Sequence, residues 1–323
     1  MKILVTGSAG FLGSHLTEKL VEEGHKVKAL MHYDSNNNWG WLENSKYKND
    51  IEFVVGDIRD FDSVYSAMQD VEEVFHLAAL IGIPYSYLSP LAYIKTNIEG
   101  TYNVMQSAKL LNTKNIIITS TSETYGTAQY TPIDEEHPKV GQSPYSATKI
   151  GADNLAISYF RSFALPIKIV RPFNIYGPRQ SARAIIPTIG AQILNGLEKI
   201  KLGNLDATRD LTFVKDTVDG FIEISRQEKL NGESVNIGMN EEISIGNLVE
   251  KISNILNKKV EVLTDKERIR PSKSEVDRLV CDNTKIKKFT NWQPKFNLET
   301  GLIETMDWIK ENKKLFKFDI YNK

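Results

Sequence analysis

Tyr145 and Lys149, in the segment Tyr145-Ser-Ala-Thr-Lys149, are the residues whose types and spacing most clearly suggest chemistry. A spacing of one helical turn places both side chains on the same face of a helix. An ammonium group beside a phenol favours the phenolate, so we expect Tyr145 to act as a base at neutral pH. Upstream, Thr121 is placed to share the proton of a substrate hydroxyl that is oxidised.

A glycine pattern near the start of the chain predicts a binding site for a dinucleotide. Gly7, Gly10 and Gly13 follow an apolar run at residues 3–5 and open an amphipathic stretch at 11–22 that we expect to be a helix. Glycines there permit a tight turn and a close approach of the backbone, so that a pyrophosphate can rest on the N–H groups at the positive end of the helix. The predicted cofactor is NAD or NADP, tightly bound and recycled. The residues expected to contact it in this region are Gly7, Gly10, Phe11, Leu12 and Gly13.

The choice between NAD and NADP depends on the residues after the second predicted strand, 27–31. Most dinucleotide-binding folds place an acidic residue there, which holds the ribose 2′-hydroxyl of NAD. Here the strand is followed by His32 and Tyr33, and Asp34 comes late. The missing carboxylate removes a repulsion against a 2′-phosphate that His32 could contact, which favours NADP slightly, although a solvated loop residue is an equally good interpretation of His32. Further contacts to the dinucleotide are expected from Asp57, Ile58, Leu77, Ala78, Ala79, Tyr145 and Lys149.

The composition is that of an ordinary globular protein. Hydrophobic residues make up 41% of the chain and charged residues 25%, and the net charge of −1 gives no field that favours nucleic acid or an anionic membrane. No apolar run approaches the length that spans a bilayer, and Met1–Lys2 leads directly into the first strand without room for a signal peptide. The single cysteine, Cys281, cannot form an internal disulfide, and no metal site is predicted. We expect a cytoplasmic protein without nucleic-acid or membrane partners.

Apolar runs of strand length alternate with stretches of helix length through the first half of the chain. This alternation predicts an α/β fold, a Rossmann-type doubly wound parallel sheet, whose ligands bind beyond the carboxyl ends of the strands. We expect a dinucleotide-binding domain at 1–174 with a returning segment at about 212–238. A smaller C-terminal substrate-binding domain is expected at 175–211 and 239–323. The expected strands of the sheet are 3–5, 27–31, 52–55, 73–76, 115–119 and 167–170, and the longest expected helices are 91–111 and 143–163.

Several motifs together make the chain resemble the extended short-chain dehydrogenase/reductase family over essentially its full length. The resemblance implies the Rossmann-type fold, a bound dinucleotide, a nucleotide-sugar substrate, and a homodimer formed by the helices at 91–111 and 143–163. Besides the glycine loop and the Tyr145–Lys149 pair, the matching motifs are Asp57–Ile58, His76-Leu-Ala-Ala79, Asn97 with Gly100–Thr101, and Arg171-Pro-Phe-Asn-Ile-Tyr-Gly-Pro178.

Glu123 separates the subgroups of this family. Epimerases usually carry small residues where this chain has Ser122 and Glu123, whereas 4,6-dehydratases carry Thr-Asp-Glu or Thr-Ser-Glu. The form Thr121-Ser-Glu123 is similar to that of the GDP-mannose 4,6-dehydratases. The chain is therefore identified as a member of the nucleotide-sugar 4,6-dehydratase subgroup.

Other segments narrow this resemblance. Arg270–Pro271 and Glu275–Asp277 look like a tail segment of the GDP-mannose dehydratases, although the spacing across 272–274 departs from it. The stretch 80–87 and the loop 39–42 look closer still to the dehydratases of legionaminic acid synthesis. The resemblance thus implies GDP-N-acetylglucosamine as the substrate, with the UDP sugar as the less favoured choice.

The resemblance also implies a lyase mechanism. Tyr145 removes the C4 hydroxyl proton while hydride passes from C4 to NAD(P)+, Glu123 takes the C5 proton that the 4-ketone acidifies, water leaves from C6, and the hydride returns to C6. Where related dehydratases carry an aspartic acid for the departing hydroxyl, this chain has Ser122, a poor acid, so Glu123 is also a candidate for protonating the leaving group. The implied catalytic residues are Thr121, Ser122, Glu123, Tyr145 and Lys149.

The substrate site is expected to bind a diphosphate. Arg209 matches a family position where an arginine meets the nucleotide diphosphate, and Arg270 and Arg179 are further candidates, because guanidinium groups make bidentate contacts with phosphate. For Arg179 a surface ion pair is an equally good interpretation. Asn174 and Glu275 complete the predicted site.

Two alternative functions stay open. A nucleotide-sugar 4-epimerase on the same scaffold would need no base at C5. A non-catalytic nucleotide-binding protein is disfavoured by the intact Thr121, Tyr145 and Lys149.

Overall fold

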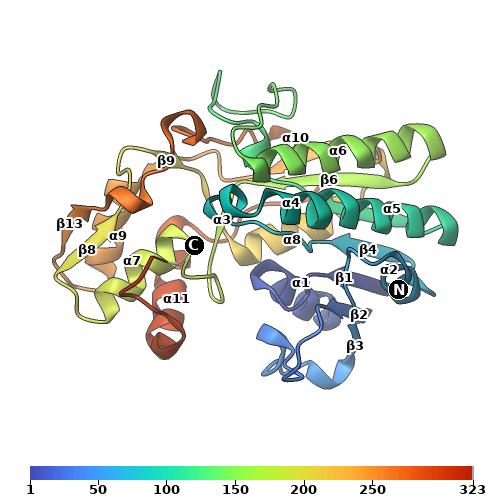
Figure 1. Ribbon diagram of the computed structural model, residues 1–323, viewed down its shortest axis with the longest axis horizontal. Coiled ribbons are helices and arrows are strands. Elements are labelled where there is room, and N and C mark those ends of the chain that lie inside the picture. Colours follow the sequence, from blue (N-terminus) through green and yellow to red (C-terminus); the bar gives the residue numbers. More distant parts are fainter. Residues whose placement is uncertain (322–323) are drawn as a thin grey trace.

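The centre of the molecule, a computed structural model that describes residues 1–321, is one parallel sheet (Figure 1). Its strands are β1 (Lys2–Thr6), β2 (Lys26–Met31), β3 (Ile51–Val55), β4 (Glu73–His76), β5 (Asn115–Thr119), β6 (Ile167–Pro172) and β11 (Ser234–Ile237). They lie in the order β11-β6-β5-β4-β1-β2-β3, and each neighbouring pair runs parallel. Aliphatic runs form the central strands because both faces of the sheet are covered.

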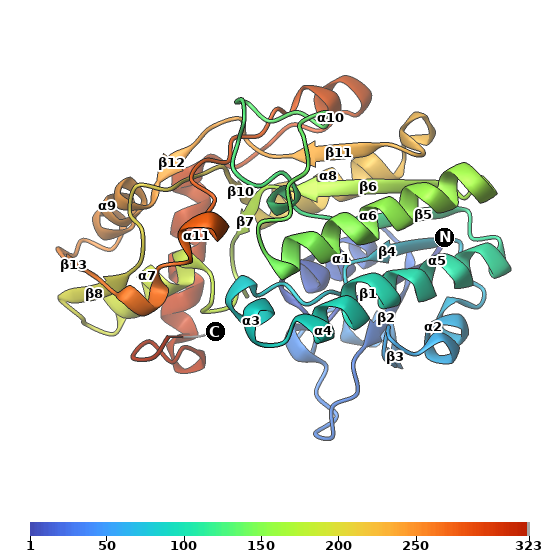
Figure 2. The same cartoon turned by 45° about the horizontal axis from the view of Figure 1, so that its top comes forward.

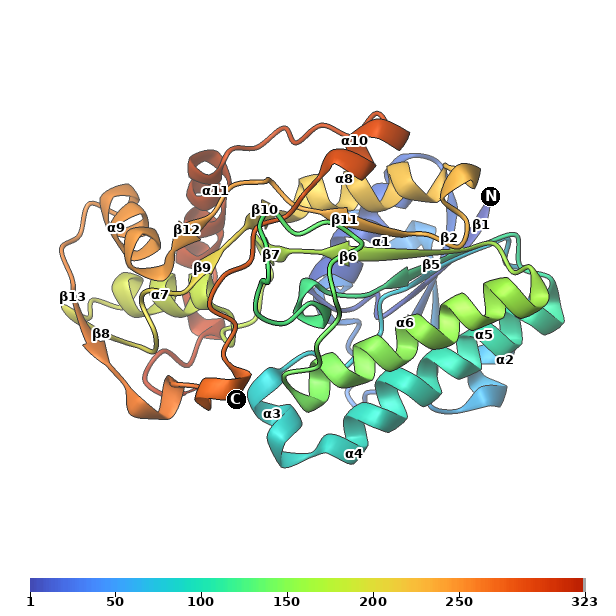
Figure 3. The same ribbon diagram turned by 90° about the horizontal axis from the view of Figure 1, so that it is seen from above.

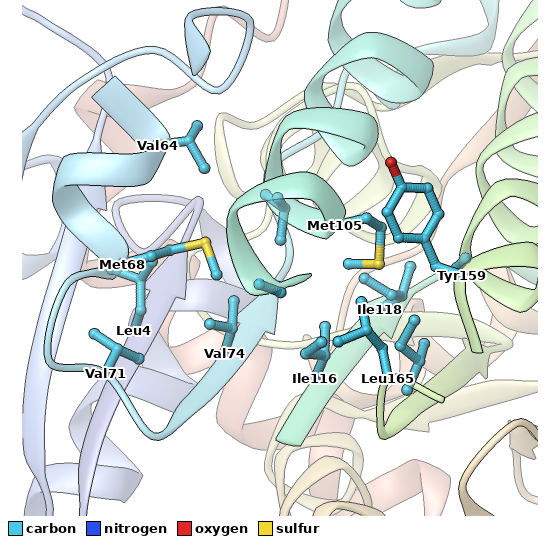
Figure 4. Close-up of a cluster of buried hydrophobic side chains, with 14 of the residues drawn as sticks. Leu4, Val64, Met68, Val71, Val74, Met105, Ile116, Ile118, Tyr159 and Leu165 are labelled. Atoms are coloured by element: carbon cyan, nitrogen blue, oxygen red, sulfur yellow. The ribbon is translucent and has the colours of Figure 1, made fainter. Parts of the chain in front are cut away.

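Helices cover both faces of this sheet (Figure 3). On one face lie α1 (Phe11–Glu22), α8 (Val214–Ser225) and α10 (Thr284–Phe289), and on the other lie α2 (Phe61–Met68), α5 (Gly100–Leu111) and α6 (Pro144–Phe163). Figure 4 shows the core on the second face, where Met68 lies near Leu4 and Val74, and Met105 and Tyr159 lie near Ile118 of β5. The fold is the doubly wound α/β sheet that the alternation of strands and helices predicts.

The winding reverses at β1, which has β2 on one side and β4 on the other. In such sheets ligands bind beyond the carboxyl ends of the strands at this switch point. Thr6 at the end of β1 is in register with His76 at the end of β4, and His76 with Ile118 of β5. The segments that follow these strands therefore meet at one edge of the sheet.

A second group of elements packs around a core of its own beside this edge (Figure 2). Ile189, Leu248 and Leu302 lie in that core and are fully buried. Two short strand pairs connect this group to the sheet. The elements are α7 (Ile185–Leu194), β8 (Lys199–Leu202), α9 (Ile245–Ile255), β13 (Glu261–Thr264) and α11 (Leu298–Glu311), and the short strands are β7 (Asn174–Tyr176), β9 (Thr208–Arg209), β10 (Leu211–Phe213) and β12 (Ile243–Ser244).

The helix expected at 91–111 is interrupted. The structure has α4 (Pro90–Tyr93), a π-helical segment Ile94–Glu99 and then α5. Asn97 in the π-helical segment is buried, accepts a hydrogen bond from the main-chain nitrogen of Leu80, and donates one to the Thr148 hydroxyl. Single π turns are frequent at functional sites, and this one ties α6 to the segment after β4.

The last part of the chain is shared between the two cores. The sequence places all of 239–323 in the smaller domain, whereas α10 and Trp292 pack against α8 and β11 in the core of the large sheet. Trp292 Nε1 donates a hydrogen bond to the carbonyl oxygen of Asp216 at 2.8 Å. Within residues 1–321 the structure has no helix that is both long and apolar enough to cross a membrane.

Candidate active site

The glycine loop between β1 and α1 packs directly against the segment that follows β4. Gly7 has a φ of +70°, and a Cβ at this position would lie 2.8 Å from the main-chain nitrogen of Ala78. A Cβ on Gly13 would lie 2.1 Å from the carbonyl oxygen of Gly7, so a glycine is required for this approach. The first turn of α1, with Phe11 and Leu12, has no side-chain cap and no acidic residue. Its N–H groups are therefore free to bind an anion, and the loop fits a dinucleotide pyrophosphate.

His76 at the end of β4 fixes the other wall of this loop. Its Nε2 lies 3.1 Å from the Thr101 hydroxyl, which already donates to a main-chain carbonyl, so Nε2 is the ring donor. Nδ1 accepts from the Thr6 hydroxyl at 2.8 Å, and the oxygen of Thr6 accepts from the main-chain nitrogens of Leu77 and Ala78. Burial lowers the pKa of His76 to about 3, so the ring is neutral. His76 is a packed, hydrogen-bonded residue that orients Leu77 and Ala78, and Ala79 continues the same segment.

His32 and Asp57 lie side by side where β2 and β3 end. His32 Nε2 is 3.3 Å from Asp57 Oδ2, and the His32 side chain is 70% exposed. A hydrogen bond from Arg59 is the main cause that lowers the pKa of Asp57 to about 2, so this carboxyl is ionised. Asp57 thus places a carboxylate, paired with Arg59, beside the end of β2, where the sequence lacks an acidic residue. The side chain of Ile58 is buried against Gly100 of α5.

Tyr145 and Lys149 project from the first turns of α6, which begins with a capping box. Lys149 Nζ donates a hydrogen bond to the carbonyl oxygen of Thr119 at 2.7 Å, and burial lowers the pKa of Lys149 to about 8. Burial raises the pKa of Tyr145, and a hydrogen bond with Thr121 acts against this shift. Removal from water thus disfavours the charged form of each group. The role of Tyr145 as a base at neutral pH stays a prediction.

A buried ion pair lies one helical turn beyond Lys149. Arg171 of β6 and Asp153 of α6 are fully buried, and Arg171 Nε and Nη2 lie 3.2 and 3.0 Å from Asp153 Oδ2. Ser120 Oγ donates to the same oxygen at 2.9 Å, whereas Asp153 Oδ1 has no hydrogen-bond partner within the described residues. The Asp153 charge opposes the burial that lowers the pKa of Lys149. The pair thus joins β6 and the end of β5 to the helix that carries Tyr145 and Lys149.

Glu123 lies in the 3₁₀ turn Ser122–Thr124, directly after β5. The Thr121 hydroxyl caps this turn by accepting a hydrogen bond from the main-chain nitrogen of Glu123 at 3.3 Å. Besides burial, the Glu123 carboxylate raises the pKa of Tyr145, and it opposes the burial that lowers the pKa of Arg209. Glu123 therefore lies within electrostatic range of both the expected catalytic residue and the expected phosphate ligand.

A cavity of about 250 Å³ is lined by the smaller group of elements and by Pro84, and Glu123, Tyr145 and Lys149 are not among its described lining residues. Three buried polar atoms of its lining residues have no hydrogen-bond partner among residues 1–321, namely Asn174 Oδ1, Gln180 Oε1 and Arg270 Nη1. Buried polar atoms are normally paired, so these three indicate a polar ligand.

Arginines surround this cavity. Glu275, the one acidic residue of the described lining, has its Oε1 3.4 Å from Arg209 Nη2 and 3.8 Å from Arg270 Nη1. The second distance is too long for a hydrogen bond. Because the lining has four arginines and one glutamate, the cavity carries a net positive charge, which suits a diphosphate. The four lining arginines are Arg183, Arg209, Arg268 and Arg270.

The cavity differs in part from the site expected from the sequence. Arg179 is not among its lining residues, because Arg179 Nη1 forms an ion pair with Glu18 Oε2 of α1 at 2.9 Å. Arg179 therefore forms an ion pair, which was the alternative to a phosphate contact in the sequence analysis. Most of the lining residues were not expected from the sequence, among them the polar residues Gln180, Arg183, Arg268 and Tyr321.

Comparison with known proteins places this geometry in a family. The family model described as GDP-mannose 4,6 dehydratase matches residues 4–305. The chain is 32% identical to a UDP-N-acetyl-alpha-D-glucosaminuronate decarboxylase of Bacillus cytotoxicus, over 96% of this chain and 98% of that protein.

Solved structures agree on the fold. A dTDP-glucose 4,6-dehydratase of Bacillus anthracis in complex with NAD has a TM-score of 0.85 at 29% identity, covering 98% of this chain and 99% of that one. A UDP-glucuronic acid 4-epimerase of Bacillus cereus in complex with UDP-glucuronic acid and NAD has a TM-score of 0.87 at 28% identity, covering 97% of this chain and 100% of that one. With the glycine loop, the Tyr145–Lys149 pair and the arginine-lined cavity in place, the chain belongs to the GDP-mannose 4,6-dehydratase family of nucleotide-sugar dehydratases and epimerases.

Proposed function

We propose that this protein is an NAD(P)-dependent nucleotide-sugar 4,6-dehydratase, a hydro-lyase that forms a 4-keto-6-deoxy sugar. The observation that carries the proposal is the Glu123 carboxylate, held by a capped turn after β5 within electrostatic range of Tyr145 and Arg209. A base at this place suits removal of a proton from C5, a step that 4-epimerisation does not need. The dTDP-glucose 4,6-dehydratases among the relatives support the same reaction class.

The residues of the site divide the proton transfers among them. Tyr145, hydrogen-bonded to Thr121, takes the proton of the C4 hydroxyl, and Lys149 holds the nicotinamide ribose. Glu123 takes the C5 proton and, because the buried hydroxyl of Ser122 is a poor acid, returns a proton to the departing C6 hydroxyl. A bound dinucleotide would accept the hydride from C4 and give it back at C6.

We propose NAD as this dinucleotide, in place of the slight preference for NADP that the sequence indicates. The solved relatives described above contain NAD. In this chain the ionised Asp57 beside His32 supplies a carboxylate that can accept a hydrogen bond from the ribose 2′-hydroxyl of NAD. The affinities of the purified protein for NAD and NADP, measured by calorimetry, test this choice.

The proposed substrate is GDP-N-acetylglucosamine, with UDP-N-acetylglucosamine as the second choice. The resemblance of Arg270–Pro271 and Glu275–Asp277 to the GDP-mannose dehydratases supports the GDP sugar, and the positively charged cavity supports a diphosphate. Incubation with each sugar nucleotide and a trace of NAD should give a product that has lost one water, detected by mass spectrometry. Equal or better turnover of the UDP sugar would overturn the preference for GDP, and accumulation of NADH in proportion to product would indicate a simple dehydrogenase.

A 4-epimerase is the second candidate, because the relatives include a UDP-glucuronate 4-epimerase of Thermodesulfobacterium geofontis, 32% identical over 97% of this chain. The same incubation separates the two reactions, since epimerisation leaves the mass unchanged and inverts C4. UDP-N-acetylglucosaminuronate belongs in the substrate set as well, because the B. cytotoxicus relative is a decarboxylase of this sugar nucleotide and decarboxylation would appear as a loss of CO2.

We further propose a homodimer built on α5 and α6, acting in the cytoplasm, with two domains in each subunit. Support for the dimer comes from the exposed apolar side chains on and near these helices, and support for the domains from the two separate cores. The domain boundaries are those expected from the sequence, with α10 moved to the dinucleotide-binding domain. The exposed side chains are Leu91, Ile94, Tyr102, Leu110 and Phe163.

A further inference from the structure

The chain beyond α11 folds back over the smaller domain toward the substrate cavity. Phe316 is buried in the core of that domain, and Phe318 packs against it. Further along, Arg268 Nη2 donates a hydrogen bond to the carbonyl oxygen of Ile320 at 3.4 Å. This tail, residues 316–321, lies outside the part of the chain that the family model matches, which ends at residue 305.

Tyr321 brings an aromatic ring to the cavity. Its ring centre lies 4.8 Å from Cζ of Arg268, within the range of a cation–π contact, and both residues line the cavity. Burial raises the pKa of the Tyr321 phenol, and the charges of Arg270 and Arg268 act against this shift. Tyr87 of α3 (Ile83–Leu88) also raises the pKa of Tyr321. Pro84 of α3 lines the same cavity, so the ring lies where the smaller domain faces α3.

The order of the side chains along the cavity indicates which part of a substrate reaches Tyr321. The charge of Glu123 opposes the burial that lowers the pKa of Arg209, and both Arg209 and Arg270 lie beside the Glu275 carboxylate. Arg268 precedes Arg270 by two residues, also lines the cavity, and packs on the end of β8, where a Cβ on Gly203 would lie 2.7 Å from the Arg268 carbonyl oxygen. If the sugar lies at Glu123 and the diphosphate at the arginines that follow, the nucleoside lies at Arg268.

We infer that Tyr321 is a binding residue for the nucleoside of the substrate, with its ring on Arg268 forming an aromatic wall at the end of the cavity away from Tyr145. This inference rests on the proposed function, because it takes the ligand to be a nucleoside diphosphate sugar. Flat aromatic rings bind nucleobases by stacking without regard to base identity, so the wall contributes affinity for purine and pyrimidine nucleotides alike.

The test compares the binding of GDP, UDP and inorganic pyrophosphate by calorimetry in the wild type and in three variants. Tyr321→Ala should lower the affinity for GDP and for UDP about tenfold, in line with the loss of one base-stacking contact, and leave the affinity for pyrophosphate unchanged. Tyr321→Phe should bind all three like the wild type, because the ring is kept. The matched control is Ile320→Ala in the same tail, whose side chain faces a small gap against α7 and not the cavity, and this variant should also bind like the wild type.

Each other outcome overturns the inference in a recognisable way. Unchanged GDP binding in Tyr321→Ala removes Tyr321 from the site, and tighter binding shows that the tail competes with the nucleotide. An equal loss of GDP and pyrophosphate binding places Tyr321 at the phosphates instead. If the wild type binds neither GDP nor UDP, the proposed substrate class falls together with the inference, whereas the first three outcomes leave the proposed function standing.

Discussion

At the scale of single residues, burial acts in opposite directions on the two groups that share α6. It raises the pKa of Tyr145 and lowers that of Lys149 to about 8, so neither group is charged as readily as it would be in water. The Thr121 hydrogen bond and the Asp153 charge each act against burial, on Tyr145 and Lys149 respectively. The reactivity of the pair thus depends on partners that the short Tyr-x-x-x-Lys motif does not contain.

Tyr145→Phe should lower the rate of C4 oxidation by about 10²–10⁴, because the ring still packs and only the proton acceptor is lost. The affinity for NAD should change little. Steady-state kinetics and NAD calorimetry on the same preparation measure both quantities. A fall of less than tenfold in kcat would remove Tyr145 from the mechanism.

The pH dependence of kcat/KM should show a basic limb near pH 8. Lys149 is an ammonium below its pKa and loses its charge as the pH rises through about 8, so activity that needs the ammonium falls on that side. Asp153→Asn removes a charge that raises this pKa, and the basic limb should move to lower pH. The substitution leaves Arg171 buried without its partner and should cost about 3–5 kcal/mol of stability, so the profile is recorded below the melting temperature of the variant.

Ser120→Ala is the matched control, because it removes one hydrogen bond to Asp153 Oδ2 but not the charge. Its basic limb should stay in place. A limb that moves equally in Ser120→Ala, or that does not move in Asp153→Asn, would show that Asp153 has no electrostatic role at Lys149.

At the scale of elements, the site is made of turns that follow parallel strands and of the first turns of helices. The glycine loop follows β1, His76 ends β4, and the Glu123 turn follows β5, so the register of the sheet brings them together. The strand pairing therefore fixes the positions of these segments. The packing of α1 against the glycine loop is a point where a small substitution would disturb the site.

Gly13→Ala should weaken NAD binding and lower stability by about 1–3 kcal/mol, because its Cβ would lie 2.1 Å from the Gly7 carbonyl oxygen and force α1 away from the loop. The control is Gly246→Ala in the first turn of α9, where the nearest heavy atom to the new Cβ lies at 3.8 Å. This control should keep NAD affinity and gain stability of about 0.5–1 kcal/mol. Calorimetry and thermal melting measure both variants, and equal behaviour of the two would contradict the close-packed loop.

At the scale of the whole molecule, the two cores lie side by side, and α5 and α6 form an outer face of the large sheet (Figure 3), where Tyr102 and Phe163 are exposed. The proposed dimer would cover that face. Tyr102→Glu should therefore shift the protein toward the monomer in sedimentation experiments at micromolar concentration. Leu315→Glu, a similarly exposed apolar residue of the smaller domain, should leave the assembly unchanged. A wild type that sediments as a monomer would remove the proposed dimer.

Much of this arrangement could be predicted from local patterns, and the exceptions share a physical cause. The strands of the sheet, α1, α6 and the catalytic motifs are encoded by short periodicities and by glycines whose role is local. The return of α10 and Trp292 to the large core, the Asp153–Arg171 pair and the approach of Tyr321 to Arg268 depend on contacts between distant segments. The π-helical turn at Asn97 likewise follows from its bonds to Leu80 and Thr148 and not from the helical pattern around it.

The measurement that tests the central claim most directly is the fate of the substrate in Glu123→Gln. The amide keeps the size of the carboxylate but cannot accept the C5 proton, whereas oxidation at C4 does not need that proton removed. On addition of GDP-N-acetylglucosamine in D2O, the variant should show the absorbance of bound NADH, with no loss of water and no deuterium at C5. The wild type should lose water and carry deuterium at C5. Dehydration by Glu123→Gln at a rate near that of the wild type would contradict the proposed mechanism, and a wild type that never exchanges C5 would favour the epimerase instead.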